Sequence, residues 1–164
     1  GKEFVVAPGS ETANGKPIVL TEADIRNVIR TKAALYAAAA VLVNSMGLKM
    51  EDVQKVHICG GFGNYLNMDK AIAIGLLPDL PRKRFNFMGN GALAGAVLCL
   101  LSRRAASEAV QVANRMTYLE LSVNAAFMSE FTSALFLPHP DERLFPSVKP
   151  VTRRNEDGKH DWVE

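Results

Sequence analysis

Two stretches of the sequence run from a short apolar segment through a glycine-rich turn into a segment of small residues that favours helix. In the first, residues 56–59 (VHIC) lead into Gly60 and Gly61. In the second, residues 84–88 (RFNFM) lead into residues 89–91 (GNG). Strands that alternate with helices predict a mainly parallel or mixed sheet, with ligands near the carboxyl ends of the strands. The sequence therefore predicts an α/β domain in which both glycine turns lie at one edge of the sheet.

Several other segments carry start and stop signals of helices and strands. Thr21 and the acidic residues after it predict a long helix that ends at Gly47, and its many alanines allow close packing against a sheet and a second helix. Asn67 is expected to cap a short helix that ends at Gly75. Further helices are expected over residues 92–104, 107–116 and 125–135, short strands over 4–7 and 18–20, and a strand or extended stretch over 117–122.

Length and composition fit one ordinary globular core, since 48% of the 164 residues are hydrophobic and 22% are charged. Residues 1–147 are expected to form this domain, and the charged residues 148–164 a flexible tail. The formal net charge of +2 does not favour a nucleic-acid partner. The longest apolar runs, residues 33–43 and 92–101, are too short to span a membrane, so no membrane partner is expected.

The cysteines bear on the cellular compartment, and the first residues bear on whether the sequence is a piece of a longer protein. Cys59 and Cys99 are the only cysteines, and both lie in apolar segments. They are expected to be small core residues in a reducing compartment, which argues for the cytoplasm. The sequence begins Gly-Lys-Glu-Phe, without an initiator methionine or an apolar signal segment, and is expected to be a piece of a longer protein.

Common catalytic motifs are missing: the sequence has no G-x-S-x-G, H-E-x-x-H, P-loop or C-x-x-C. His139, Asp141 and Glu142 could be assembled into a metal site on paper, but exposed proline-flanked loops commonly hold such residues without metal, and no metal site is predicted. His57, inside an apolar strand, is expected to be a hydrogen-bonded structural histidine rather than a ligand.

The first glycine turn admits two interpretations. Gly60, Gly61 and Gly63 carry no Cβ, so the main chain can approach a flat or anionic ligand that other residues would block. The spacing G-G-x-G is not the G-x-G-x-x-G dinucleotide fingerprint. A ligand site and a tight turn needed only for packing therefore both stay open.

Several uncommon strings together resemble the C-terminal domain of the reductive activators of corrinoid proteins, over roughly residues 3 to 147. They are residues 21–37, 58–66 (ICGGFGNYL), 74–79 (IGLLPD) and 88–96 (MGNGALAGA), with 117–122 and 136–139 extending the match.

This resemblance implies part of an RNase H-like lobe of an actin-like ATPase, with a mixed sheet flanked by helices and extra C-terminal helices. The superfamily includes acetate and sugar kinases, the seventy-kilodalton heat-shock chaperones and actin. In it, a strand followed by paired glycines binds adenosine, and a small-residue helix packs at the interdomain hinge; residues 56–61 and 89–96 match these two features. The implied nucleotide-binding residues are Gly60, Gly61, Phe62, Gly63, Asn64, Gly89, Asn90 and Gly91.

The resemblance also implies ATP and Mg²⁺ as cofactors and a corrinoid protein of a methyltransferase system as partner. In the family, a [2Fe-2S] ferredoxin domain reduces an inactive cob(II)amide, and ATP makes this uphill step possible. Two cysteines are too few for such a cluster, which is therefore expected only in another domain of the parent chain, and the fragment alone is expected to be inactive. No catalytic base is assigned, because ordinary roles explain Asp69, Asp79 and Glu120 equally well. Whether the chain forms a homodimer is left open by the sequence.

An alternative function is a docking module that binds a corrinoid or methyltransferase protein without nucleotide. Exposed apolar residues around Phe127, Phe131 and Phe136 would form its surface. The helical spacing of Phe127, Phe131 and Leu135 instead favours a buried stripe.

Overall fold

The computed structural model describes residues 3–61, 65–149, 153–154 and 160–161, which form a mixed α/β arrangement of small sheets and helices. The helices are α1 (Glu22–Ser45), α2 (Met68–Ala73), α3 (Gly91–Leu101), α4 (Arg103–Ala113) and α5 (Ala125–Ser133). The strands are β1 (Glu3–Ala7), β2 (Ile18–Thr21), β3 (Val56–Cys59), β4 (Phe85–Gly89), β5 (Arg153–Arg154) and β6 (His160–Asp161).

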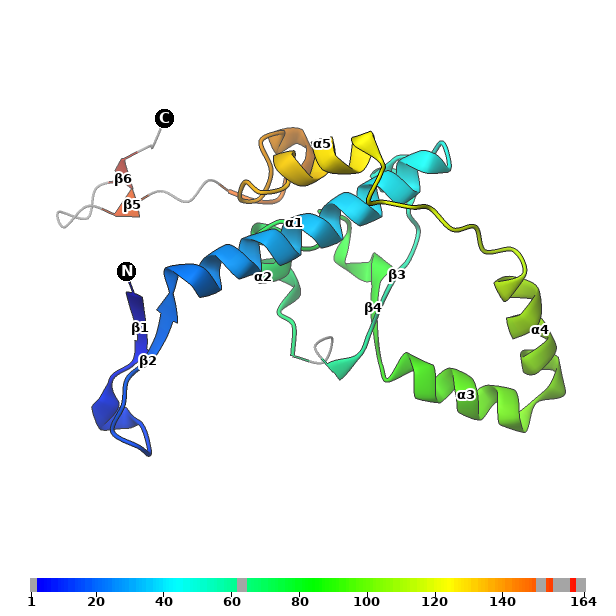
Figure 1. Ribbon diagram of the computed structural model, residues 1–164, viewed down its shortest axis with the longest axis horizontal. Coiled ribbons are helices and arrows are strands. Elements are labelled where there is room, and N and C mark those ends of the chain that lie inside the picture. The colour runs from blue at the N-terminus through cyan, green and yellow to red at the C-terminus, as the bar shows by residue number, and fades with distance from the viewer. Residues whose placement is uncertain (1–2, 62–64, 150–152, 155–159, 162–164) are drawn as a thin grey trace.

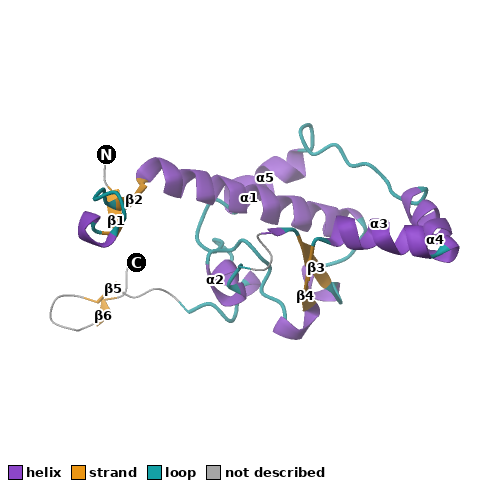
Figure 2. Cartoon of the chain, turned by 90° about the horizontal axis from the view of Figure 1, so that it is seen from below, coloured by secondary structure: helices purple, strands orange, loops and turns teal. Residues whose placement is uncertain are grey.

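Helix α1 is a long helix that runs through the middle of the molecule (Figure 1). The hairpin of β1 and β2 leads into its N-terminal end, and α5 packs along it. The parallel pair β3 and β4 lies with α2 on the side of α1 away from α5, as both views show (Figures 1 and 2). Helices α3 and α4 pack against each other and form an arm that extends from the end of β4.

The start of α1 is fixed by a reciprocal capping box at Thr21, as the sequence predicts. Asp24 N donates to Thr21 Oγ1 at 3.2 Å, and Thr21 N donates to an Asp24 carboxylate oxygen at 2.9 Å. The hydrogen bonds from Thr21 lower the pKa of Asp24. After the last turn of α1, Gly47 takes a φ of +70°, which confirms it as the residue that ends the helix.

The sheets are smaller than the sequence suggests, because each described sheet has two strands. β1 pairs with β2 antiparallel, β3 with β4 parallel, and β5 with β6 antiparallel within the expected tail. The residues of β3 alternate between half-buried and exposed, and His57 and Cys59 are exposed. Cys99 is only half-buried, so neither cysteine is the core residue that the sequence predicts.

One hydrophobic core joins α1, α2, β4 and the C-terminal loop. Its buried members are Ala33, Tyr36, Ala40, Ile72, Leu80, Phe85, Ala134 and Phe145. The ring of Tyr36 lies 5.5 Å from that of Phe145 and 5.7 Å from that of His139. The loop that follows α5 therefore closes the core against α1.

The arm of α3 and α4 has no buried residue, although α3 is apolar on every face. Ser102 Oγ accepts a hydrogen bond from Ala105 N at 3.2 Å and starts α4, so the predicted helix over 92–104 ends at Leu101 and the next begins at Arg103, before the predicted 107. The stretch 117–122 forms no strand.

The chain exposes 12914 Å², whereas a compact monomer of this size would expose about 8,000 Å². None of the described helices combines the length and apolar character needed to cross a membrane.

Lys32 is the buried charged residue of the described core, with 1% of its surface exposed. Its Nζ donates to the carbonyl oxygen of Phe136 and, at 2.9 Å, to that of Pro138. This side chain therefore ties α1 to the C-terminal loop. Burial lowers the pKa of Lys32 from 10.5 to about 8, because the charged form loses hydration.

The stability of the protein is expected to rise between pH 8 and 10.5 on account of Lys32. In this window the unfolded chain still binds the lysine proton and the folded chain has lost it, so raising the pH favours folding. Urea unfolding across this range measures the effect as a gain of up to about 3 kcal/mol. Other groups titrate here too, so Lys32→Met is the control; an equal rise in that variant would contradict the assignment.

Candidate functional site

The two glycine turns meet at one edge of the β3 and β4 pair, as the sequence predicts. Cys59 is paired with Gly89 across a register shift, and Gly60 N donates to the carbonyl oxygen of Gly89 at 2.6 Å. Gly60 has a φ of +99° and Gly89 a φ of +59°, in the left-handed region that favours glycine. Backbone geometry thus favours glycine at both positions, whether or not a ligand binds.

Gly61 differs from these two glycines. Its φ is not positive, and a Cβ added to it would meet no atom of the described residues within 4 Å. Packing among the described residues therefore does not explain the absence of a side chain at Gly61. None of the described residues fills the space beside its bare backbone, where a flat ligand would have access.

The N-terminal end of α3 lies directly beside this turn. Asn90 caps α3 by accepting a hydrogen bond from Leu93 N at 3.0 Å on its side-chain oxygen. A Cβ on Gly91 would lie 2.8 Å from the Sγ atom of Cys59, so the absence of a side chain lets α3 start against β3. The first N–H groups of α3 have no acceptor within the helix, and they give this end a partial positive charge.

Other residues named from the sequence lie outside the described residues or at other places in the fold. Phe62, Gly63 and Asn64 lie outside the described residues. A Cβ added to Gly95 would meet no atom of the described residues within 4 Å. Asn67 caps α2, as predicted, by accepting from Lys70 N at 3.0 Å.

Asp69 and Asp79 are held by Arg82, away from the glycine turns. Arg82 Nε lies 2.9 Å from an Asp69 oxygen, and Arg82 Nη1 lies 3.0 Å from an Asp79 oxygen. Burial raises the pKa of Asp79, but hydrogen bonds from Ser147 and Arg82 outweigh it, and the net shift is downward. These residues precede β4, whereas the glycine turns follow the ends of the strands. Both carboxylates thus tie segments of the fold together.

Glu120 is an exposed residue whose carboxylate stabilises a local turn. Ser122 Oγ donates to it at 2.6 Å, Ser122 N at 3.0 Å, and the Tyr118 hydroxyl donates as well. The hydrogen bond from Ser122, followed by that from Tyr118, lowers the pKa of Glu120 to about 2. A carboxylate held in this way is a poor proton acceptor near neutral pH.

His139 lies beside the core, where its ring faces those of Tyr36 and Phe145. Its Nδ1 accepts a hydrogen bond from Asp141 N at 3.0 Å, and its buried Nε2 lies 3.5 Å from a Glu130 oxygen without forming a hydrogen bond. Asp141 pairs with Arg143 at 2.8 Å. Within the part of the chain that the structure describes, no three His, Cys, Asp or Glu side chains come together to hold a metal ion.

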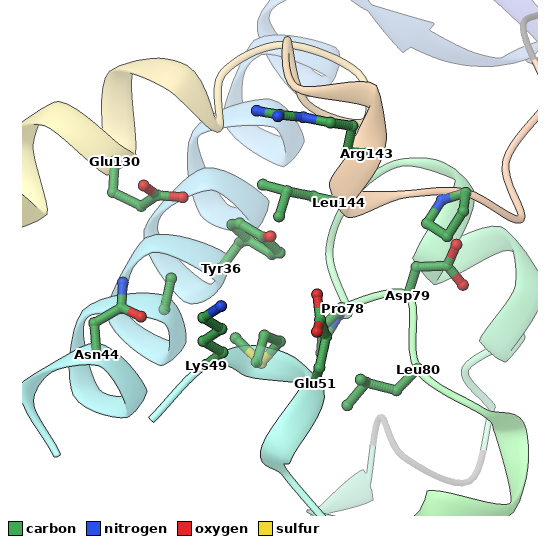
Figure 3. Close-up of a pocket in the computed structure, with 13 residues that line it drawn as sticks. Tyr36, Asn44, Lys49, Glu51, Pro78, Asp79, Leu80, Glu130, Arg143 and Leu144 are labelled. Carbon is green, nitrogen blue, oxygen red and sulfur yellow. The ribbon is translucent and has the colours of Figure 1, made fainter. Parts of the chain in front are cut away.

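Sequence reasoning missed a hollow of about 300 Å³ (Figure 3). Tyr36 from α1, Lys49 and Glu51 from the segment before β3, and Glu130 from α5 line it together with Arg143. With residues 78–80, the lining comes from five separate segments of the sequence, so no local motif could have indicated the hollow. It lies beside the starts of β3 and β4, at the end opposite the glycine turns.

Comparison with known families decides where this fold belongs. Residues 1–149 match the family described as the C-terminal domain of RACo, the ASKHA domain. The chain belongs to this family. As a RACo C-terminal domain, it has the actin-like α/β class that the sequence predicts, and the resemblance found from its motifs is confirmed.

Similar proteins share the same description. The chain is 34% identical to the corrinoid activation enzyme RamQ of Eubacterium limosum over 78% of its length, and 27% identical to the [Co(II) methylated amine-specific corrinoid protein] reductase of Methanosarcina barkeri over 71%. It spans 22% and 21% of these relatives. A solved reductive activator for corrinoid, iron-sulfur protein matches this RACo C-terminal domain with a TM-score of 0.80 and 52% identity, over 89% of the chain and 23% of that structure.

Proposed function

We propose that this chain forms the C-terminal part of an ATP-dependent reductive activator of corrinoid proteins and supplies the adenosine side of its nucleotide cleft. The observation that carries the proposal is the open backbone at Gly61, beside the bonded turns of Gly60 and Gly89. Its relatives are named as activators or reductases of corrinoid proteins. A corrinoid protein of a methyltransferase system is the proposed partner, and the cytoplasm the proposed compartment.

The residues present fit a nucleotide in two respects. The main chain at Gly60 and Gly61 would accept the flat base, because no side chain at Gly61 occupies the space beside it. The N–H groups at the start of α3 would attract ribose or phosphate oxygens. Mg²⁺ would arrive with the nucleotide, since Asp69 and Asp79 are already paired with Arg82.

The proposed role of nucleotide is conformational. Binding would favour a closed arrangement of this lobe with the rest of the activator, and closure would change the affinity for the corrinoid partner or the access of its cobalt to the electron donor. A [2Fe-2S] cluster would belong to another domain, because the two cysteines here are free and too few.

Gly61→Val is expected to weaken ATP binding at least tenfold while leaving the melting temperature without nucleotide nearly unchanged. A Cβ at this position would meet no atom of the described residues within 4 Å, but the valine side chain would occupy the space proposed for the base. The measurement is the melting temperature with and without excess Mg-ATP, because a ligand at 100 times its Kd stabilises by about 2.7 kcal/mol. It is made on this chain and, in parallel, on a complete activator that contains it.

Ala126→Val is the matched control, because it adds volume at an exposed position of α5. It should keep the full stabilisation by ATP. Equal stabilisation of Gly61→Val and the parent by ATP would place the nucleotide elsewhere. No stabilisation of the complete activator would remove the nucleotide-binding role.

The docking alternative requires exposed apolar surface around Phe127, Phe131 and Phe136, and the structure exposes less of it than the sequence suggests. Phe131 and Leu135 pack against the core, which confirms the predicted stripe for these two residues. The ring of Phe127 stacks on that of Phe131 at 6.1 Å. Phe136 is exposed, but a single exposed aromatic residue gives no reason to prefer a docking function.

A further inference from the structure

The hollow opposite the glycine turns has an apolar floor and a polar rim. Tyr36, Ala40 and Leu80 form buried parts of the floor, and Met50 and Leu144 line it as well. Asn44, Lys49 and Glu51 are exposed residues at its mouth. A volume of about 300 Å³ is enough for one long side chain or a small molecule of that size.

The charges around the hollow are unequal once existing ion pairs are taken into account. Asp79 is paired with Arg82, and Arg143 with Asp141. Among the described residues, no ion pair includes Lys49 or Glu51, and Glu130 has one contact, with His139 Nε2 at 3.5 Å. Apart from these ion pairs, the hollow is therefore lined by two carboxylates, those of Glu51 and Glu130, and by one ammonium group, that of Lys49.

Tyr36 provides the second observation. Its side chain points into the hollow in Figure 3 and is 4% exposed, yet no described residue forms a hydrogen bond with its hydroxyl. Burial, followed by the negative charges of Glu130 and Asp141, raises the pKa of Tyr36 to about 12. Glu130 and Asp141 thus contribute negative potential at the Tyr36 hydroxyl, and this hydroxyl lacks a hydrogen-bond partner among the described residues.

We propose that this hollow binds an alkylguanidinium group, with the alkyl part over the apolar floor and the cation between Glu51, Glu130 and the ring of Tyr36. A guanidinium fits better than an ammonium for two reasons. It is more weakly hydrated, and its planar face stacks on an aromatic ring while its edge pairs with carboxylates. Such a group occurs on small free molecules and on the arginine side chains of partner proteins.

The test is an NMR titration of the ¹⁵N-labelled chain with n-propylguanidinium and, separately, with N-acetyl-arginine N-methylamide. Saturable shifts are expected at the amides of Ala40, Met50, Glu51 and Leu80. Binding of the blocked arginine at similar strength would identify a partner side chain as the source, and binding of propylguanidinium alone would identify a free small molecule. Shifts that grow linearly without saturation for both probes would overturn the proposal.

Two variants and two further probes test the role of charge. Glu130→Gln keeps the shape of the side chain and is expected to weaken binding at least about fivefold, since it removes a charge-assisted contact. Glu108→Gln, on α4 and outside the core, is the matched control and should bind as the parent does. The neutral isostere n-propylurea is expected not to bind. The anionic probe butyrate is expected to bind more weakly than propylguanidinium. Tighter binding of butyrate, or unchanged binding in Glu130→Gln with an intact amide spectrum, would overturn the proposal.

Discussion

Replacing Gly75 with alanine is expected to lower the free energy of unfolding by about 2 to 5 kcal/mol. Gly75 has a φ of +74°, where an L-residue costs about 1 to 2 kcal/mol. An added Cβ would also lie 3.0 Å from the carbonyl carbon of Pro138 and closer still to its oxygen. Neither backbone can yield cheaply, so overpacking adds about 1 to 3 kcal/mol. Urea unfolding monitored by circular dichroism measures the loss.

Gly47→Ala separates these two costs. Gly47 has nearly the same φ, +70°, but a Cβ there would meet no atom of the described residues within 4 Å. Its substitution is expected to cost only the conformational part, about 1 to 2 kcal/mol. If both variants lost the same stability, the contact between the end of α2 and Pro138 would have no energetic role.

Phe145→Ala is expected to cost about 3 to 5 kcal/mol, which is typical of a buried phenylalanine. Phe145 is 2% exposed, packs on Tyr36, and its ring lies 6.4 Å from that of His139. Its removal opens a cavity between α1 and the C-terminal loop. The loss is measured by urea unfolding, and NMR spectra of the variant should show the largest changes around Tyr36.

Phe136→Ala is the matched control from the same loop. Phe136 is 61% exposed, so truncation removes little buried area and should change stability by less than about 1 kcal/mol. Similar losses for the two variants would show that the C-terminal loop does not close the core as described.

The local features of this fold could be predicted from the sequence because they depend on a few neighbouring residues. Thr21, Asn67, Asn90 and Asn124 each cap the helix that follows, and Gly47 ends α1. The meeting of the two glycine turns was also predictable, since parallel strands place their carboxyl ends at one edge.

Burial was harder to predict, because it depends on which segments come together. An apolar strand predicts burial of Cys59, yet the two-stranded sheet leaves it exposed. Lys32 lies in an alanine-rich helix and would be expected to reach solvent, but the loop after α5 supplies two carbonyl oxygens that hold its charge in the core. That loop is more than 100 residues away in sequence.

The candidate site was predicted in outline only. The sequence indicates Gly60 and Gly61 equally, but the positive φ favours glycine only at the first, although a Cβ would meet no described atom within 4 Å at either position. Distinguishing these causes requires φ values and neighbours. The hollow around Tyr36 had no sequence signal at all, because its charges come from segments joined only by the fold.

The hydrogen bond between Gly60 and Gly89 has a mechanical consequence. Gly89 lies two residues before α3, an 11-residue helix about 16 Å long. A rotation of about 10° at the start of such a rod displaces its far end by about 3 Å. A small shift of the Gly60 peptide would thus become a larger displacement at Leu101. Helix α3 would in this way convert a change at the glycine turn into a movement of the far end of the arm.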